Sequence, residues 1–220
     1  MSIKNILKKV VYGSSFLEKL YHCLTQIGSG GYSIVNHGYG RYTCDVTGKN
    51  NRISIGKDTL LKDAAFRIRG NDNQIIIDEN CTIGQKCSFW IEGNGSVIRI
   101  GKQSTFTQMI HFCAQENDVS IVVGMDCMFS NNIIVRTSDS HPIYSMRDGK
   151  RINPAKDVAI GNHVWIAPNV KVMKGVDIGS GTIIGSDTIV TKSIPENVLA
   201  VGHPARVVKE KIKWTREQLF

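Results

Sequence analysis

The strongest constraint on this chain is a six-residue repeat that runs without a break from residue 157 to residue 192. Its blocks read DVAIGN, HVWIAP, NVKVMK, GVDIGS, GTIIGS and DTIVTK. The fourth position is always aliphatic and the second is Val or Thr: Ile160, Ile166, Val172, Ile178, Ile184 and Val190, with Val158, Val164, Val170, Val176, Thr182 and Thr188. A helix repeats its apolar face about every 3.6 residues and a strand about every two. Neither element alone explains a period of six.

Each block instead predicts a short strand followed by a turn. Alternate residues of a strand point to one side, which places the second and fourth positions together. Glycine and small polar residues between the strands permit sharp turns. Three blocks then close a triangular coil of about 18 residues, and stacked coils pair their strands in parallel at about 4.8 Å. The predicted fold class is an all-β solenoid, a parallel β-helix whose coils are stable only when stacked.

Weaker copies of the same pattern extend the solenoid towards the N-terminus. RISIGKDTLLKDA, IIIDENCTIGQKCSFW, VIRIGKQSTF and VSIVVGMDCMFSNNIIV carry the spacing. The insertions RGNDNQ, EGNGS and AQEND separate them, and their Gly and Asn residues suit corner loops. We expect about six coils between residues 51 and 192. These comprise coils over 51–136 and more regular coils over 157–192.

The two ends of the chain follow a different pattern. Basic residues outnumber acidic ones by 27 to 19, a net charge of +8, and many lie in KNILKK and KEKIKWTR near the termini. Residues 3–24 have an amphipathic-helix pattern, so we expect residues 1–50 to form an N-terminal helix and cap. That helix either covers the fold or makes peripheral membrane contact, since no apolar run reaches the roughly 18 residues that span a bilayer. Residues 193–220 are expected to form a tail with a short C-terminal helix.

The six cysteines contain no C-x-x-C pair that would indicate a zinc or redox site. We interpret them as small buried hydrophobic residues with free thiols, which favours a cytoplasmic location. They are Cys23, Cys44, Cys81, Cys87, Cys113 and Cys127.

Residues 137–156 interrupt the repeat. The segment lies within RTSDSHPIYSMRDGKRINPAK and adds nothing to a solenoid core. Long loops inside compact domains are often functional, and this one contains His141, a residue type suited to accept a proton near neutral pH. Asp139 either orients the imidazole or is a solvated carboxylate. A disordered surface loop with an incidental histidine is the alternative.

The chain from about residue 119 to 214 resembles a known family. SDSHPI, followed by INPAKDVAIGNHVWIAPNVKVMKGVDIGSGTIIGSDTIVTKSIPENVLAVGHPARVVK, is similar to the bacterial O-acetyltransferase branch of the hexapeptide-repeat acyltransferases. His141 and Trp165, 24 positions apart, resemble the sialic acid capsule polysaccharide O-acetyltransferases most closely. The resemblance implies a left-handed coil, a homotrimer and acetyl-coenzyme A as acetyl donor.

The same resemblance implies the roles of individual residues. His141 would be the catalytic base, acting on a sugar or polysaccharide hydroxyl, and Trp165 would lie at the acetyl-transfer centre. The cofactor would bind in a groove between neighbouring subunits, along positions that match Pro168, Ser186, Thr191, Lys192, Arg206 and Lys209. The three basic residues among them suit the cofactor phosphates.

Other functions are also consistent with parts of the sequence. An N-acetyltransferase of an amino sugar or nucleotide sugar is the main enzyme alternative, although the N-terminus shows no G-x-G-x-x-G motif. A non-catalytic β-helix subunit is the second alternative and would not need His141. We expect no metal, because no two of the six histidines are five residues apart as in the zinc hydratases of this fold. No recognised nucleic-acid-binding module is present, and the motifs leave the acceptor sugar open.

Overall fold

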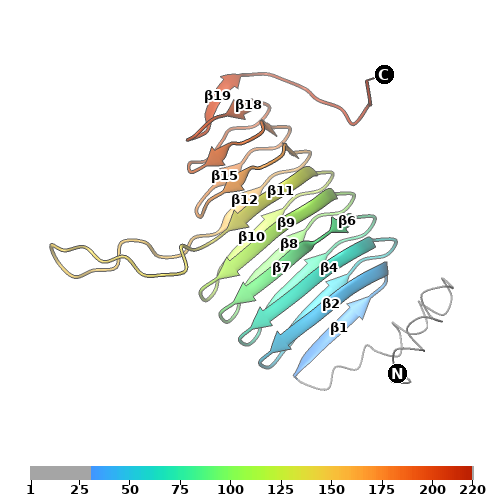
Figure 1. The fold of residues 1–220 in the computed structure, drawn as a ribbon, viewed down its shortest axis with the longest axis vertical. Helices are drawn as coiled ribbons and strands as arrows, with labels where there is room; N and C mark the ends of the chain where they lie inside the picture. Colours follow the sequence, from blue (N-terminus) through green and yellow to red (C-terminus); the bar gives the residue numbers. More distant parts are fainter. Residues whose placement is uncertain (1–30, 220) are drawn as a thin grey trace.

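The computed structural model describes residues 31–219, which form a parallel β-solenoid (Figure 1). Strands from successive coils stack along its length, from the N-terminal end in blue to the C-terminal end in red. One sheet holds β1 (Tyr32–Asn36), β3 (Asn51–Ile55), β5 (Gln74–Ile77), β8 (Val97–Ile100), β10 (Ser120–Val123), β12 (Val158–Ile160) and β15 (Asp177–Ile178), in that order. All their pairings are parallel.

The second sheet covers the other sides of each coil. It contains β2 (Tyr39–Thr47), β4 (Leu60–Arg69), β6 (Thr82–Gln85), β7 (Cys87–Glu92), β9 (Thr105–Gln115), β11 (Met128–Arg136), β13 (Trp165–Ile166), β14 (Lys171–Val172), β16 (Ile183–Ile184), β17 (Ile189–Val190), β18 (Leu199–Val201) and β19 (Arg206–Lys209). Among the strands of residues 31–219 that form this sheet, only β19 pairs antiparallel, against β18. The predicted fold class, an all-β parallel solenoid, is confirmed.

The core is built from equivalent residues of successive coils. Ile53, Ile75, Ile98 and Ile121 are register partners in turn, and each is fully buried. On another side, Phe66, Phe89 and Phe112 stack with ring centroids 5.3 Å apart at each step. Both predicted inward positions of the six-residue blocks are buried throughout residues 157–192. The repeat therefore identified the core-facing residues of the C-terminal coils correctly.

The insertions between the N-terminal coils form stacked corners, as their Gly and Asn content predicts. The side chain of Asn94 accepts a hydrogen bond from the amide of Asn71, and the side chain of Asn117 accepts one from the amide of Asn94, each at 2.9 Å. Gly70 has a φ of +129°, and a Cβ there would lie 1.8 Å from the Gly93 carbonyl oxygen. Only glycine fits so close to the next coil.

Two sequence expectations need correction at the ends of the solenoid. The stack begins at β1 and β2, within the region assigned to the N-terminal cap, so the solenoid starts before residue 51. The number of coils therefore differs slightly from the expected six. The expected C-terminal helix is wrong, because residues 210–219 are non-helical. Their contacts are made with the coils instead: the amide of Ile212 donates to the Asn197 carbonyl at 2.9 Å. The expected N-terminal helix, with its alternative of membrane contact, lies outside the described residues.

None of the described residues belongs to a helix that could cross a membrane.

The interruption of the repeat leaves the stack intact. Ile121 pairs with Val158, an offset of 158 − 121 = 37 positions, whereas Ala159 pairs with Asp177, an offset of 177 − 159 = 18. The coil that carries the insertion therefore holds 37 − 18 = 19 more residues than the next one. These residues leave after β11 and return before β12, and they project from the side of the solenoid (Figure 1).

Candidate functional site

Residues 137–157, between β11 and β12, form a folded arm. Tyr144 and Arg151 form an antiparallel bridge across it. The amide of Ser145 donates to the Lys150 carbonyl at 2.8 Å, and the amide of Ile152 donates to the Ile143 carbonyl at 2.9 Å. The two limbs thus hold each other through main-chain hydrogen bonds, which argues against the alternative of a disordered loop.

A buried asparagine closes the base of the arm. The Oδ1 atom of Asn153 accepts a hydrogen bond from the amide of Ile143 at 2.6 Å. Its Nδ2 atom donates to the carbonyl of His141 and to the carboxylate of Asp139, each at 2.9 Å. Lys174, from the following coil, donates to Asp139 at 2.5 Å and to the Asn153 carbonyl at 3.0 Å. The Asn153 side chain therefore joins the main chain of His141 to Asp139, and Lys174 holds Asp139 and Asn153 to the solenoid.

A second tie joins the arm to the corner after β9. Arg151 donates two hydrogen bonds of 2.7 Å to the carboxylate of Glu116, and the Ser138 hydroxyl donates a third, also of 2.7 Å. The hydrogen bonds from Arg151 are the main reason that the pKa of Glu116 is lowered to about 2. A bidentate pair of this kind also fixes the direction of the returning limb.

The predicted base, His141, is exposed to solvent. Within residues 31–219 no group hydrogen-bonds its imidazole ring, which leaves both ring nitrogens accessible. The predicted orienting carboxylate, Asp139, instead contacts Lys174 and Asn153, and the hydrogen bond from Lys174 is the main cause that lowers its pKa. Asp139 thus helps to fix the base of the arm, a role that the sequence pattern did not indicate.

The predicted partner of His141, Trp165, lies on β13 and is half-buried, as expected for an outward position. Its register partner on β11 is Met128, at the start of that strand, whereas the arm begins after Arg136, at the end of the same strand. The amide of Trp165 donates to the Thr182 carbonyl at 2.9 Å. Within this chain, Trp165 and the root of the arm therefore lie at opposite ends of β11.

The predicted cofactor positions lie in the C-terminal coils and the strand that follows them. Pro168 is partly buried, and its carbonyl accepts a hydrogen bond from the Asp187 amide at 2.9 Å. The other five are exposed: Ser186, Thr191 and Lys192, with Arg206 and Lys209 at the two ends of β19.

A pocket of about 380 Å³ lies beside these positions. It is lined by Asn132, Asn169, Lys171, Asp187, Ile189 and His203. Two of its lining residues, Asn169 and Asp187, directly follow the predicted positions Pro168 and Ser186 in the sequence. Lys171 and His203 also line it, and neither residue was predicted from the sequence.

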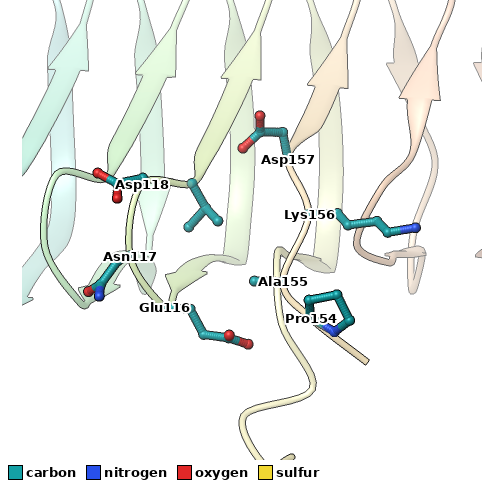
Figure 2. A pocket seen from close by; sticks show the side chains of 8 residues that line it. Glu116, Asn117, Asp118, Pro154, Ala155, Lys156 and Asp157 are labelled. Carbon is teal, nitrogen blue, oxygen red and sulfur yellow. The ribbon is translucent and has the colours of Figure 1, made fainter. Parts of the chain in front are cut away.

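A larger pocket of about 570 Å³ lies at the base of the arm, and none of the predicted site residues lines it (Figure 2). The corner Glu116–Val119 forms one side, and the returning limb Pro154–Asp157 forms the other. Three carboxylates line it, from Glu116, Asp118 and Asp157, against the single lysine Lys156. This acidic lining is unsuited to cofactor phosphates.

The described cysteines are unpaired, as expected. Cys81, Cys87, Cys113 and Cys127 are buried, whereas Cys44 is only half-buried. Burial raises the pKa of both Cys113 and Cys127 to about 11, so neither thiol is a ready nucleophile. Among residues 31–219, no three His, Cys, Asp or Glu side chains cluster closely enough to hold a metal ion.

Comparison with known proteins gives consistent similarities. Residues 157–192 match the family described as bacterial transferase hexapeptide (six repeats). The chain is 36% identical over 174 residues to a polysialic acid O-acetyltransferase of Neisseria meningitidis, which covers 78% of this chain and 79% of that protein. It is 55% identical over 91 residues to a polysialic acid O-acetyltransferase of Escherichia coli O1:K1 / APEC, but spans only 30% of that longer protein.

Two solved structures extend the similarity to the fold. The polysialic acid O-acetyltransferase OatWY is 33% identical, with a TM-score of 0.76, and the match covers 86% of this chain and 89% of that one. The polySia-specific acetyltransferase NeuO is also 33% identical, with a TM-score of 0.63 and coverage of 85% and 90%.

Proposed function

Because this chain belongs to the hexapeptide-repeat acetyltransferases, in the family of the polysialic acid O-acetyltransferases, we propose that it acetylates a hydroxyl of a sialic-acid-containing polysaccharide, with acetyl-CoA as donor. Membership confirms the predicted enzyme class, acyltransferase. The similarity to a polysialic acid O-acetyltransferase over 78% of the chain carries the proposal. The net charge of +8 supports an acidic acceptor, because it attracts anions.

The proposed reaction is a direct transfer between the two substrates. A sugar hydroxyl oxygen attacks the thioester carbonyl carbon, and His141 accepts the hydroxyl proton. The tetrahedral intermediate then breaks its carbon–sulfur bond, and the coenzyme A thiolate takes that proton from the imidazolium. The solvent exposure of His141 on an anchored arm supports this role. The buried, high-pKa thiols of Cys113 and Cys127 disfavour a route through an acetyl-cysteine.

The tetrahedral intermediate needs a hydrogen-bond donor for its oxyanion. The family resemblance implies that Trp165 lies at the acetyl-transfer centre, so a main-chain N–H near Trp165 is the first candidate for this donor. The amides of Trp165 and Ala167 already donate to the carbonyls of Thr182 and Ile184, each at 2.9 Å. The indole N–H of Trp165 has no partner in the described part of the chain, so we assign the oxyanion contact to this group.

We include in the proposal the left-handed coil and the homotrimer that the resemblance implies. Within one subunit, Trp165 and the root of the arm lie at opposite ends of β11, so a neighbouring subunit would bring the two functional groups together. Four large apolar side chains of the arm are more than half exposed, which supports packing against a second copy: Ile143, Tyr144, Met146 and Ile152. Co-assembly of His141→Ala and Trp165→Ala subunits should then restore part of the activity that each variant lacks.

The experiment that tests the proposed function is an acceptor screen. Purified protein is incubated with acetyl-CoA and either polysialic acid or a neutral oligosaccharide, and the products are analysed by mass spectrometry. We expect O-acetyl groups on polysialic acid and release of free coenzyme A. Transfer only to the neutral oligosaccharide would reject the acidic acceptor, and transfer to an amino group would favour the N-acetyltransferase alternative.

A further inference from the structure

The C-terminal segment 211–216 is attached to the coils although it has no regular secondary structure. Trp214 is only 6% exposed, in a stretch where most neighbours are exposed. Arg216 donates to the Cys127 carbonyl at 2.9 Å and to the Thr105 hydroxyl at 3.0 Å, across more than one coil. We call residues 211–216 the strap.

The indole of Trp214 is fixed against His163 by three contacts. The two rings are stacked, with centroids 3.9 Å apart and planes at 8°. The Trp214 Nε1–H donates to the His163 carbonyl at 3.0 Å. In return, His163 Nε2 lies 3.1 Å from the Trp214 carbonyl. The side chain of each residue thus contacts both the ring and the main-chain carbonyl of the other.

A carboxylate completes this attachment. Asp126 lies 2.6 Å from His163 Nδ1 through one oxygen and 2.7 Å from Arg216 Nε through the other. Both ring nitrogens of His163 therefore lie within hydrogen-bond distance of an oxygen atom, one from a carbonyl and one from a carboxylate. Burial acts to raise the pKa of Asp126, but the hydrogen bonds from His163 and Arg216 outweigh it and the net shift is downward.

Trp214 also lies against Trp165, the residue at the proposed acetyl-transfer centre. Their ring centroids are 5.9 Å apart with planes at 49°, a usual geometry for an aromatic pair. His163, which Trp214 covers, is two residues before Trp165 in the chain. One side of the half-buried Trp165 indole thus packs against Trp214, which is 214 − 165 = 49 residues away in the sequence.

From these contacts we propose that Trp214 is a positioning residue, which fixes the orientation of the Trp165 indole when the strap is docked on Asp126 and His163. The proposal rests on the proposed function, in which the Trp165 N–H binds the oxyanion. Without Trp214 the Trp165 side chain gains free space on one side and can change its χ angles. An oxyanion donor acts only when held within hydrogen-bond distance, so a loose indole lowers the turnover rate more than substrate binding.

The experiment compares two variants in which Trp165 is the sole tryptophan of the chain. Both carry Trp90→Phe; one adds Trp214→Phe, which keeps a ring against His163 and Trp165, and the other adds Trp214→Ala, which does not. We expect Trp165 emission to shift to the red and acrylamide quenching to rise in the Ala variant. We expect its kcat to be about tenfold below that of the Phe variant, with KM for acetyl-CoA within about twofold.

Gln218→Ala in the Trp90→Phe background is the matched control, because Gln218 is exposed just beyond the strap. It should leave kcat unchanged. Equal emission and equal kcat in the Ala and Phe variants would overturn the role of Trp214 while the enzyme remains an acetyltransferase. An inactive wild-type protein in the acceptor screen would instead reject the proposed function, and with it the reaction that Trp214 serves.

A folding defect in the Ala variant would be detected by circular dichroism and by its size in solution. In that case Arg216→Gln, added to the Trp90→Phe and Trp214→Phe protein, replaces the Ala variant in the comparison. This change removes the ion pair with Asp126 and leaves an aromatic ring at position 214. The same red shift and loss of kcat are expected. An unchanged Arg216→Gln protein would show that the strap does not control Trp165.

Discussion

The attachment of the arm can be tested at its single buried amide. Asn153→Ala removes hydrogen bonds to the Ile143 amide, the His141 carbonyl and the Asp139 carboxylate, while the main-chain contacts of residue 153 persist. With two neutral bonds at about 1 kcal/mol each and one bond to a charged group at about 1.5–3 kcal/mol, the local stability of the arm falls by about 3.5–5 kcal/mol. Because each 1.4 kcal/mol is a factor of about ten, the open population of the arm rises at least about 10²-fold.

Hydrogen exchange followed by mass spectrometry measures this local opening. Peptides from residues 137–156 of Asn153→Ala should exchange about 10²-fold faster at protected amides. Peptides from β5 and β8 should not change, because the substitution does not touch the core. We also expect kcat to fall at least about tenfold, since His141 loses its anchor.

Asp148→Ala is the control for the Asn153 experiment, because Asp148 lies exposed towards the far end of the same arm. It should leave exchange at the base of the arm unchanged. Wild-type exchange in Asn153→Ala would refute the anchor, and faster exchange throughout the solenoid would show that the effect is on global stability instead.

Three further predictions concern single side chains. His141→Ala should lower kcat by a factor of about 10² to 10⁴, with cofactor affinity and oligomeric size unchanged; retention of more than about a tenth of the wild-type rate in steady-state assays would place the base elsewhere. Arg206→Ala should raise KM for acetyl-CoA about fivefold at low salt and less at high salt, since an exposed phosphate contact is worth about 1 kcal/mol and is screened; an unchanged KM at both salt concentrations removes Arg206 from the cofactor site. The pKa of Glu116 is lowered from 4.5 to about 2, so its pairing with Arg151 stabilises the arm above the unfolded value and is lost as the pH falls from about 4.5 towards 2. The rate at which pepsin cleaves the arm should therefore increase as the pH falls over that range. In Glu116→Gln, which lacks the titrating carboxyl group, this contribution to the increase should be absent.

The parts of the fold that depend on local periodicity were predictable from the sequence. A block such as DVAIGN indicates which residues face inward, because the same two positions of every block must pack against the coils above and below. Val158 and Ile160 are accordingly buried. The position of the insertion was predictable for the same reason, since it is where the period fails.

Contacts between segments far apart in sequence were not predictable in this way. Lys174 occupies the last position of its block, which in a bare solenoid is a solvated corner. It gains a partner only because the folded arm brings Asp139 to it. Trp214 lies in a run of Lys and Glu that is typical of an exposed helix, and its burial depends on His163, 51 residues away. A pattern within a short window contains no information on either pairing.

The register of the stack has a consequence for how such a protein can change over evolution. The coil closes with Val158 beside Ile121 after the arm has left and returned, so the core is complete without any side chain of the arm tip. Substitutions or length changes between residues 143 and 152 leave the packed interior unaffected. The arm is therefore free to vary in sequence and length without loss of core packing, while the stacked interior varies only where volume and shape are conserved.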